Sequence, residues 1–427
     1  MAENGRVIVV GSGLSGLTAA TLAARAGRDV TVLERASTLG GRAASHPLGG
    51  AAVNQGPHAL YKGGAAEQTL TELGVTYVGA APNLDGARAW HRGSLPALPM
   101  GPASLLTSPV LGWRARLEAA RLFTNMGPAT AGETETLDAW IARSAEDADL
   151  RALLAAMARL STYTNAPHLL SARAALTQLE LAQRHGVLYL DGGWSTLVGG
   201  LEAAARRSGV RILRGATVDA LTRRDGAWEV RFGDESLLAE DVVLATGPAL
   251  AAELTGATFD VVPVHAACLD LCMKPLQRGV PRFILGIDRP TYTSVHSDAA
   301  RLGPDGTVVL QLAKYIDPRA PVDSAADLAE LEALMDLAHP TWRPAVLARR
   351  FLPRMTVVNA VVTPGGRPDV DATGLAGVHL AGDWVGPEGM LADAAFASGR
   401  RAAHTLLHRT TARTKVSATP PHAVSRS

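Results

Sequence analysis

The sequence predicts an α/β protein built from two interleaved parts, one around a parallel sheet and one with a mixed sheet and a helical cap. Three observations support this fold. A β-branched run at residues 6–10 leads directly into a glycine-rich turn, a second apolar strand ends at Glu34, and two long insertions carry helical and strand-like patterns. A chain of 427 residues, 47% of them hydrophobic, can bury a large core.

The first strand, turn and helix have the pattern of a Rossmann-type nucleotide-binding unit. The strand "RVIVV" is followed at once by "GSGLSG". Its first glycine permits a tight turn, the second lets the backbone approach a pyrophosphate, and the third, Gly16, lets the helix lie close to the strand. Gly27 then ends the helix. The predicted phosphate-binding turn consists of Gly11, Ser12, Gly13, Leu14 and Ser15.

The next segment predicts what the nucleotide is. Glu34 ends the strand "DVTVLE", where its carboxylate would accept from ribose hydroxyls and repel a 2′-phosphate, which disfavours NADP. The adjacent Arg35 is a further candidate cofactor-binding residue. Gly41 and Arg42, in "LGGR", then offer a second close backbone approach and a guanidinium. These suit a longer ligand that continues past the first turn, as FAD does.

These motifs resemble those of a known superfamily. "GSGLSG", "LER" and "LGGR" are similar to the start of the flavin-dependent amine oxidases and phytoene desaturases, and "NQGPHALY" (54–61) is similar to their segment beside the flavin ring. The resemblance implies FAD contacts at Gly56, Pro57 and His58. It continues through 189–221, where it implies that Val218 contacts adenine through its backbone, and through "AEDVVLATGP" (239–248).

The closing segment, "GVHLAGDWVGPEGMLADAAFASGRRAAHTL" (377–406), resembles the family's last motif. The resemblance implies contacts from Gly382 and Asp383 to the ribityl and phosphate groups. It also implies that Gly389, Met390 and Leu391 start a helix aimed at the flavin. A helix start carries free amides and a positive dipole end, which suit the negative charge of a reduced flavin.

Two departures from the family pattern matter. Gln55 stands where the family usually has an acid, two positions before Pro57, which leaves the role of that segment beside the ring open. No cysteine lies near residue 390, so the expected FAD is noncovalent. We assign no metal site.

The motifs predict a discontinuous organisation. The FAD-binding domain is expected at 1–85, 189–261 and 373–410, and the substrate domain at 86–188 and 262–372. The first insertion is helical in pattern and the second strand-like, which predicts a sheet floor with a helical cap and the substrate between cap and flavin. The polar segment 411–427 reads as a disordered tail.

Charge and composition exclude several partners. The 41 basic and 40 acidic residues leave no field that would gather nucleic acid. No basic-then-apolar leader precedes residue 6, so a cytoplasmic location is expected. Cys268 and Cys272 lie too far apart along one strand for a disulfide and are expected in the core.

An uncharged stretch at 95–113 is long enough to span a bilayer, but its four prolines rule out a continuous helix. We expect an apolar loop that leads into a helix from about Leu111. Plain packing or the lining of a substrate entrance is favoured there, with peripheral membrane contact as the alternative.

Catalytic candidates are few, because the flavin performs the chemistry. Lys314 is one of four lysines and sits inside "VVLQLAKYI", where the resemblance to amine oxidases implies a lysine that holds a water near flavin N5; a solvated strand lysine is the alternative. His58 is the second candidate, and Tyr163 and Trp194 are possible pocket aromatics.

The expected function is hydride transfer from a small or lipophilic organic substrate to flavin N5, in a desaturation, oxidation or isomerisation. A phytoene desaturase-like reaction is favoured because the signatures of a two-tyrosine amine cage are missing. The alternatives are an amine oxidase-like enzyme and a non-catalytic flavin-bound redox sensor. The electron acceptor (oxygen, a quinone or another carrier) and the oligomeric state stay open.

Overall fold

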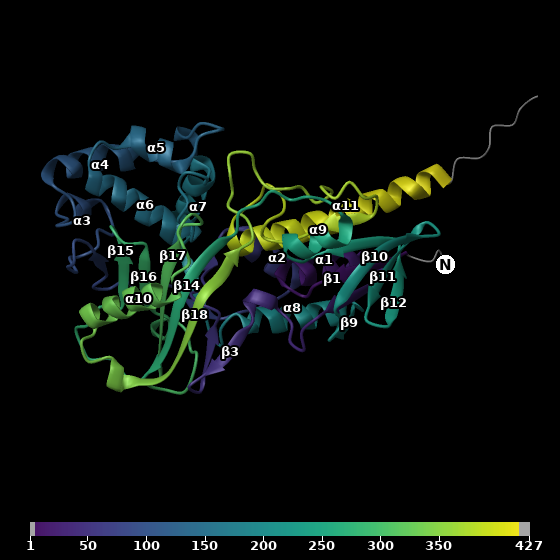
Figure 1. The fold of residues 1–427 in the computed structure, drawn as a ribbon, viewed down its shortest axis with the longest axis horizontal. Coiled ribbons are helices and arrows are strands. Elements are labelled where there is room, and N and C mark those ends of the chain that lie inside the picture. Colours follow the sequence, from purple (N-terminus) through teal and green to yellow (C-terminus); the bar gives the residue numbers. More distant parts are fainter. Residues whose placement is uncertain (1–4, 418–427) are drawn as a thin grey trace, which may run out of the picture.

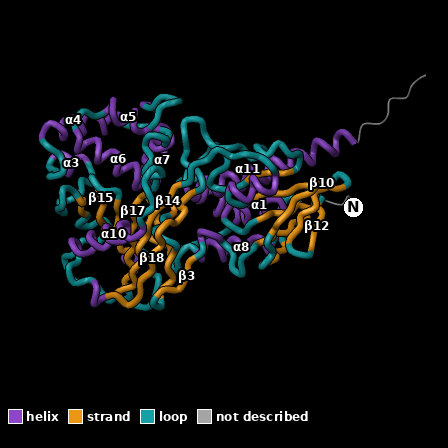
Figure 2. The backbone as a smooth tube through the Cα atoms, in the orientation of Figure 1, coloured by secondary structure: helices purple, strands orange, loops and turns teal. Residues whose placement is uncertain are grey.

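The computed structural model describes residues 5–417, with side chains except at residue 102 and at residues 409–417. Figure 1 shows two halves side by side, one with the N-terminal strands and helix α11, the other with the cap helices above a second sheet. Figure 2 shows strands beneath the cap helices in one half, and strands at the right-hand end of the other half beside helices α1 and α11.

The first half is built on a parallel five-stranded sheet. In spatial order its strands are β19 (Val378–Leu380), β13 (Asp241–Leu244), β1 (Arg6–Val10), β2 (Asp29–Glu34) and β9 (Arg211–Arg214). β1 and β2 are rich in valine and buried on both faces, as central parallel strands require.

Different layers cover the two faces of this sheet. Val7 and Val9 pack against α1 (Leu14–Arg25), α8 (Ser195–Arg207) and α11 (Leu391–Ser417). Ile8 and Val10 face the antiparallel strands β10 (Val218–Arg224), β11 (Ala227–Phe232) and β12 (Glu235–Ala239), together with α9 (Pro248–Thr255). This alternation follows from the two-residue period of a strand.

The second half contains a mixed six-stranded sheet. In spatial order its strands are β18 (Val346–Val358), β14 (Val264–Met273), β17 (Val308–Ile316), β16 (Thr291–Val295), β15 (Phe283–Gly286) and β7 (Arg88–Trp90). Leu269 and Leu312 face α10 (Ser324–Ala338), whereas Cys268 and Ala313 face the cap. The cap helices are α3 (Pro102–Leu106), α4 (Trp113–Asn125), α5 (Leu137–Ser144), α6 (Ala148–Thr162) and α7 (Ala172–His185).

Short elements connect the halves. They are β3 (Ser45–Leu48), β4 (Ala51–Asn54), β5 (Leu60–Tyr61), α2 (Ala65–Leu73), β6 (Gly79–Ala80) and β8 (Val187–Leu190). Four 3₁₀ turns complete the fold: η1 (Gly41–Ala43), η2 (Pro128–Thr130), η3 (His296–Asp298) and η4 (Arg343–Ala345).

The predicted α/β class with a Rossmann-type parallel sheet is confirmed, and the helical patterns in the first insertion correspond to α4, α5 and α6. Helix α10 was missed inside the region predicted as strand-like. The expected disordered tail is wrong for residues 411–417, where α11 continues to Ser417; residues 418–427 lie outside the described residues. Cys268 and Cys272 are both buried in β14.

Segment 95–113 contains the short helix α3, and α4 begins at Trp113, two residues after the expected Leu111. Across residues 5–417, no helix combines the length and the apolar character needed to cross a membrane.

Candidate active site

The glycine turn after β1 leaves room for a ligand in front of α1. Gly11 has φ of +100°, and a Cβ there would lie 2.5 Å from the Ala245 carbonyl oxygen. A Cβ on Gly16 would lie 2.0 Å from the Gly11 carbonyl oxygen, so only glycine lets α1 pack this closely. A Cβ on Gly13 would meet no atom within 4 Å. This open space beside free helix amides fits a pyrophosphate.

Glu34 lies at the carboxyl end of β2, beside the same turn. Its Oε2 accepts hydrogen bonds from the Ser12 amide at 2.9 Å and the Ser12 hydroxyl at 2.6 Å, and its Oε1 accepts from the Ala36 amide at 2.9 Å. A carboxylate has about four acceptor positions, so one remains for a ribose hydroxyl. The adjacent Arg35 side chain is exposed.

The start of β10 lies next to Glu34. The Ala216 amide donates to the Glu34 carbonyl oxygen at 2.9 Å, which brings the buried Val218 to the carboxyl end of β2. Glu34 and Val218, which lie 184 positions apart in the sequence, thus meet where the resemblance implies ribose and adenine.

Arg42 and Asp383 join the two ends of the sequence at one point. The Arg42 Nη1 donates to Asp383 Oδ2 at 2.6 Å and to the Val357 carbonyl oxygen at 2.7 Å. Asn359 holds the other carboxylate oxygen through its Nδ2 at 3.0 Å. Asp383 is buried and Arg42 is partly exposed. The glycine pair before Arg42 and the closing motif therefore form one wall of the candidate site.

Sequence reasoning missed the residue that clamps the closing loop. Arg367 donates to the carbonyl oxygens of Asp383, Gly386, Glu388 and Gly389 at 2.8–3.1 Å. Burial lowers the pKa of the Arg367 guanidinium to about 10, although Asp383 opposes that shift. Arg367 belongs to no recognisable motif, because its partners are backbone carbonyls that any sequence supplies.

The first residues of α11 lie where the two halves meet. Gly382 and Gly389 both have positive φ, and Leu391 starts the helix with φ of +55°, which is uncommon for a residue other than glycine. Met390 is buried, and both Met390 and Leu391 pack against the cluster formed by the cap and its sheet. The N-terminal end of α11 thus points toward the boundary between the parallel sheet and the cap half.

A buried polar network anchors the segment 54–58 to the second sheet. Asp270, on β14, accepts from Gln311 Nε2 at 2.7 Å and from Arg350 Nη2 at 2.6 Å, and the Gly56 amide also hydrogen-bonds this carboxylate. Arg350 in turn donates to the Asn54 carbonyl oxygen. Gly56 has φ of +74°, and a Cβ there would lie 2.8 Å from Cys268 Sγ. This network was not predicted from the sequence.

Three predicted aromatic or histidine side chains gather around that segment. His58 Nδ1 lies 3.0 Å from the Gly56 carbonyl oxygen, and its ring meets the Trp194 ring edge-on with centroids 5.0 Å apart. Burial lowers the pKa of His58, so the imidazole is neutral near pH 7. Tyr163 donates from its hydroxyl to the Pro57 carbonyl oxygen at 3.3 Å.

Gln55 points away from this group and toward the glycine pair. Its Nε2 donates to the Gly41 carbonyl oxygen at 3.4 Å and lies 3.1 Å from His46 Nε2. The amide therefore ties segment 54–58 to the turn before Arg42.

Lys314 does not join the site, which corrects the prediction made for it. Its Nζ lies 2.8 Å from Asp327 Oδ1 and 2.6 Å from Glu330 Oε2, and both acids belong to α10. Segment 54–58 packs on the opposite face of the sheet, against Cys268. Since alternate residues of a strand face opposite sides, Ala313 and Tyr315 face the cap and Lys314 faces α10. Lys314 has a structural role there.

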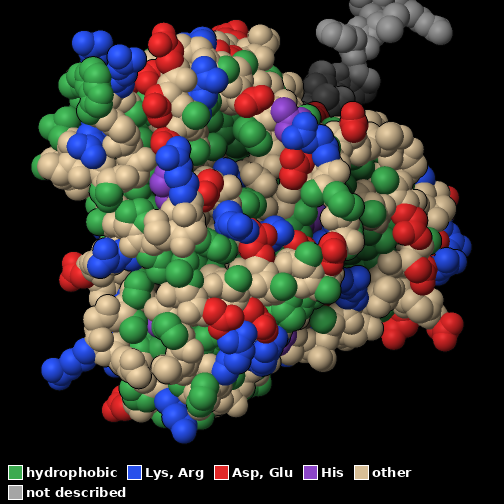
Figure 3. Space-filling view, turned by 60° about the vertical axis from the view of Figure 1, so that its left-hand side comes forward, with side chains coloured by type: hydrophobic (Ala, Val, Ile, Leu, Met, Phe, Trp, Pro, Cys, Tyr) green, Lys and Arg blue, Asp and Glu red, His purple; other side chains and the backbone are tan. Residues whose placement is uncertain are grey.

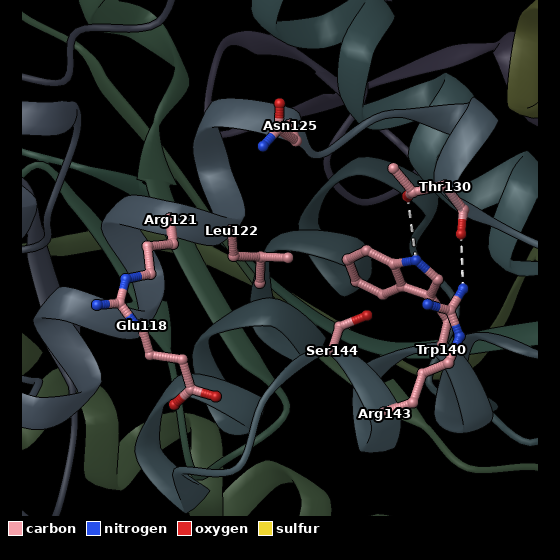
Figure 4. Close-up of a pocket in the computed structure, with 8 residues that line it drawn as sticks. All are labelled: Glu118, Arg121, Leu122, Asn125, Thr130, Trp140, Arg143 and Ser144. Atoms are coloured by element: carbon pink, nitrogen blue, oxygen red, sulfur yellow. Dashed lines mark hydrogen bonds between the residues drawn. The ribbon is translucent and has the colours of Figure 1, made fainter.

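A separate hollow of about 370 Å³ lies on the cap between α4, η2 and α5 (Figure 4). Its wall includes Arg121, Trp140 and Arg143, and Trp140 Nε1 donates to Thr130 Oγ1 at 3.2 Å. None of the predicted cofactor-binding residues lines it. Among the described residues, no group of three His, Cys, Asp or Glu side chains is placed to hold a metal ion.

Residues 6–404 match the family described as FAD dependent oxidoreductase. The chain belongs to this family. FAD is therefore the cofactor of this FAD-dependent oxidoreductase, and the open glycine turn, Glu34 and the Arg42–Asp383 pair fit it. The match spans both sheets and the cap, in agreement with the predicted resemblance.

A similar curated protein is the hydroxyneurosporene desaturase of Rubrivivax gelatinosus, which is 27% identical over 280 residues. That match covers 56% of this chain and 52% of the desaturase, so the chain spans about half the length of this relative.

Two solved structures share the fold. An oxidoreductase from Methanosarcina mazei has a TM-score of 0.77 at 18% identity, covering 93% of this chain and 100% of that one. A variant of putrescine oxidase has a TM-score of 0.73 at 16% identity, covering 95% and 99%. At these identities the likeness shows the fold alone.

Proposed function

We propose that this FAD-dependent oxidoreductase removes hydrogen from a lipophilic organic substrate, in a desaturation like that named for its curated relative. One observation carries the proposal. The cap-facing side of β14 and β17 is apolar or aromatic from Ala266 and Cys268 to Ala313 and Tyr315, next to the segment 54–58. Such a surface suits hydrocarbon and excludes water.

The same surface offers little to a charged amine. Asp270 is the one acid on that face of β14 and β17, and Arg350 and Gln311 already occupy its carboxylate. Tyr163 and Tyr315 do form an aromatic pair, but their rings meet edge-on, with an interplanar angle of 81° and centroids 5.7 Å apart. A cage that holds an ammonium needs ring faces turned toward the cation.

The side chains of the site would position and insulate the reacting groups. FAD, when bound, supplies a two-electron acceptor that takes a hydride at N5. The neutral His58 and the indole of Trp194 would form a wall beside segment 56–58, with no formal charge that would draw in water. The N-terminal amides of α11 would stabilise the negative charge that the cofactor gains.

Several expectations remain part of this proposal. The FAD is held without a covalent bond, since both cysteines lie in β14 and none lies near residue 390. We also propose that Gly11, Glu34, Arg42 and Val218 contact FAD, as the sequence predicts. The electron acceptor is oxygen, a quinone or another carrier.

The experiment is an anaerobic substrate panel with the FAD-loaded protein, read by the loss of the oxidised flavin's visible absorbance. Matched probes carry the same alkyl chain with either an internal alkene or a terminal amine, and phytoene and putrescine represent the two classes at their extremes. The proposal expects bleaching by a polyene or alkene and none by the amines. Bleaching by amines alone would establish the amine oxidase alternative, and a flavin that no probe reduces, yet that dithionite reduces, would favour the redox sensor.

A further inference from the structure

Large apolar side chains are exposed together on the cap, away from the candidate active site. Met100 is 51% exposed, Leu106 50%, Trp113 66% and Leu117 50%. We call these four residues the cap patch. They come from the loop before α3, from α3 and from the first turns of α4, and the two helices pack against each other. Trp113 and Leu117 are one helical turn apart and therefore share a face of α4.

Cationic side chains border the cap patch. α4 carries Arg114, Arg116 and Arg121 against a single acid, Glu118. The Arg114 guanidinium lies over the Trp113 ring at 5.2 Å. Glu118 is turned inward, because its carboxylate accepts from the amides of Glu146 and Asp147.

Two of these arginines lack an ion-pair partner in the described part of the chain. Within residues 5–417, neither Arg114 nor Arg121 has a carboxylate oxygen within ion-pair distance, although Glu118 lines the same hollow as Arg121. Arg121 lines one side of the hollow in Figure 4. In Figure 3, which brings the cap side forward, hydrophobic and basic side chains lie next to one another at the upper left. An apolar patch with a basic border complements a surface that has an anionic outer layer over an apolar interior.

We propose that the cap patch docks on an anionic lipid bilayer, with Trp113 and Leu117 at the level of the headgroups and Arg114 and Arg121 against lipid phosphates. Tryptophan is enriched at membrane interfaces, and a peripheral element buries its apolar face in the boundary between headgroups and acyl chains. The benefit to a lipophilic substrate rests on the proposed function, but the docking itself does not.

A second copy of the chain fits the cap patch less well than a bilayer does. A standard protein interface buries about 800 Å² on each partner, far more than four half-exposed side chains supply. Two copies would also bring the same unpaired arginines face to face, since a twofold interface places like surfaces together. A bilayer with anionic headgroups satisfies both the apolar and the cationic groups.

The test is co-flotation of the FAD-loaded protein with vesicles of phosphatidylcholine, with and without phosphatidylglycerol. We expect binding to the anionic vesicles, a blue shift of tryptophan emission, and weaker binding at high salt. Arg114→Gln with Arg121→Gln should weaken binding about 25-fold, since each basic side chain near an anionic surface contributes about fivefold. Trp113→Gln with Leu117→Gln should weaken it at least 10-fold and abolish the blue shift.

The control is Val322→Gln with Leu347→Gln, a pair of exposed apolar residues outside the cap that should leave binding unchanged. No binding of the wild-type protein to anionic vesicles would overturn the proposal, as would an equal loss in the control pair. Light scattering that shows a dimer dependent on Trp113, without vesicle binding, would assign the patch to a second copy. Because no substrate is present, a failed substrate panel would not affect these outcomes.

Discussion

At the scale of single residues, Lys314 shows how a strand position decides a role. Its neighbours Ala313 and Tyr315 face the cap, and its ammonium is held between Asp327 and Glu330. Burial lowers the pKa of Lys314, but the hydrogen bonds that its ammonium donates to Asp327 and Glu330 outweigh this and raise it. The lysine therefore ties α10 to the sheet, and we propose that it takes no part in the chemistry of the flavin.

Lys314→Met should leave FAD affinity and the rate of flavin reoxidation unchanged, and should lower stability by about 1–3 kcal/mol, because two partly buried carboxylates lose their shared partner. Denaturant unfolding and stopped-flow reoxidation measure the two quantities. Lys274→Met is the matched control, since Lys274 is exposed and should tolerate the change. A 10-fold slower reoxidation in the Lys314 variant alone would restore the catalytic role.

Asp393 is a second residue with a measurable signature. It is 3% exposed in the first turn of α11 and accepts from the Ala66 amide at 2.7 Å. Burial raises the pKa of its carboxyl to about 6, although the Ala66 hydrogen bond opposes the shift. The folded protein therefore holds this proton more tightly than the unfolded chain does.

This contribution to stability is present in full below about pH 4, the ordinary carboxyl value, and is lost as pH rises through about 6. Asp393→Asn keeps an acceptor for the Ala66 amide and removes the titration. The wild-type protein should lose up to about 3 kcal/mol relative to this variant between pH 4 and pH 7. Denaturant unfolding at both pH values measures the difference. Asp371→Asn, at an exposed site, should show no such trend, and a pH-independent difference for Asp393→Asn would contradict the shifted pKa.

At the scale of elements, the glycine turn before α1 separates folding from cofactor binding. A Cβ on Gly16 would lie 2.0 Å from the Gly11 carbonyl oxygen, whereas a Cβ on Gly13 would meet no protein atom within 4 Å. Gly13 also has an ordinary φ of −67°. Gly16 therefore serves the packing of the helix on the strand, and Gly13 serves the approach of the ligand.

Gly16→Ala should therefore destabilise the apoprotein by about 3 kcal/mol or more, on the scale of an overpacked core site. Gly13→Ala should leave apoprotein stability within about 0.5 kcal/mol and weaken FAD binding at least 10-fold, because the new methyl group stands in the path of the pyrophosphate. Unfolding of the apoproteins and flavin titration distinguish the two effects. Equal losses of stability and of FAD affinity in the two variants would show that Gly16 and Gly13 do not have these separate roles.

The elements also show what the sequence reveals and what it hides. The turn at Gly11, the end of β2 at Glu34 and the start of α11 were predictable, because each carries a short sequence pattern: a glycine turn after a β-branched strand, an acid at a strand end, and a glycine before a run of small residues. Asn359, Arg367 and the pair of Asp270 with Arg350 were not, because their partners lie far away in sequence and many are backbone atoms. Lys314 was misplaced because both faces of β17 are buried, so its pattern does not tell one face from the other.

At the scale of the whole molecule, three segments distant in sequence meet between the halves. The segment 54–58 is anchored to β14, the closing loop is paired with Arg42, and the first turn of α11 packs against the cap cluster. The parallel sheet supplies the turn proposed to bind FAD, and the second sheet with its cap supplies an apolar wall. This arrangement supports the proposal that a lipophilic substrate, rather than a charged one, lies beside the cofactor.

The central claim is tested most directly by the stoichiometry of one anaerobic turnover. FAD-loaded protein is titrated with the lipophilic alkene or polyene that bleaches it most completely. The amount and the molecular mass of the product are then determined by mass spectrometry. The account predicts that each reduced flavin is matched by one product molecule that has lost two hydrogen atoms, and that amines of the same chain length leave the flavin oxidised. A flavin reduced only by amines, or one reduced by no lipophilic substrate at all, would contradict it.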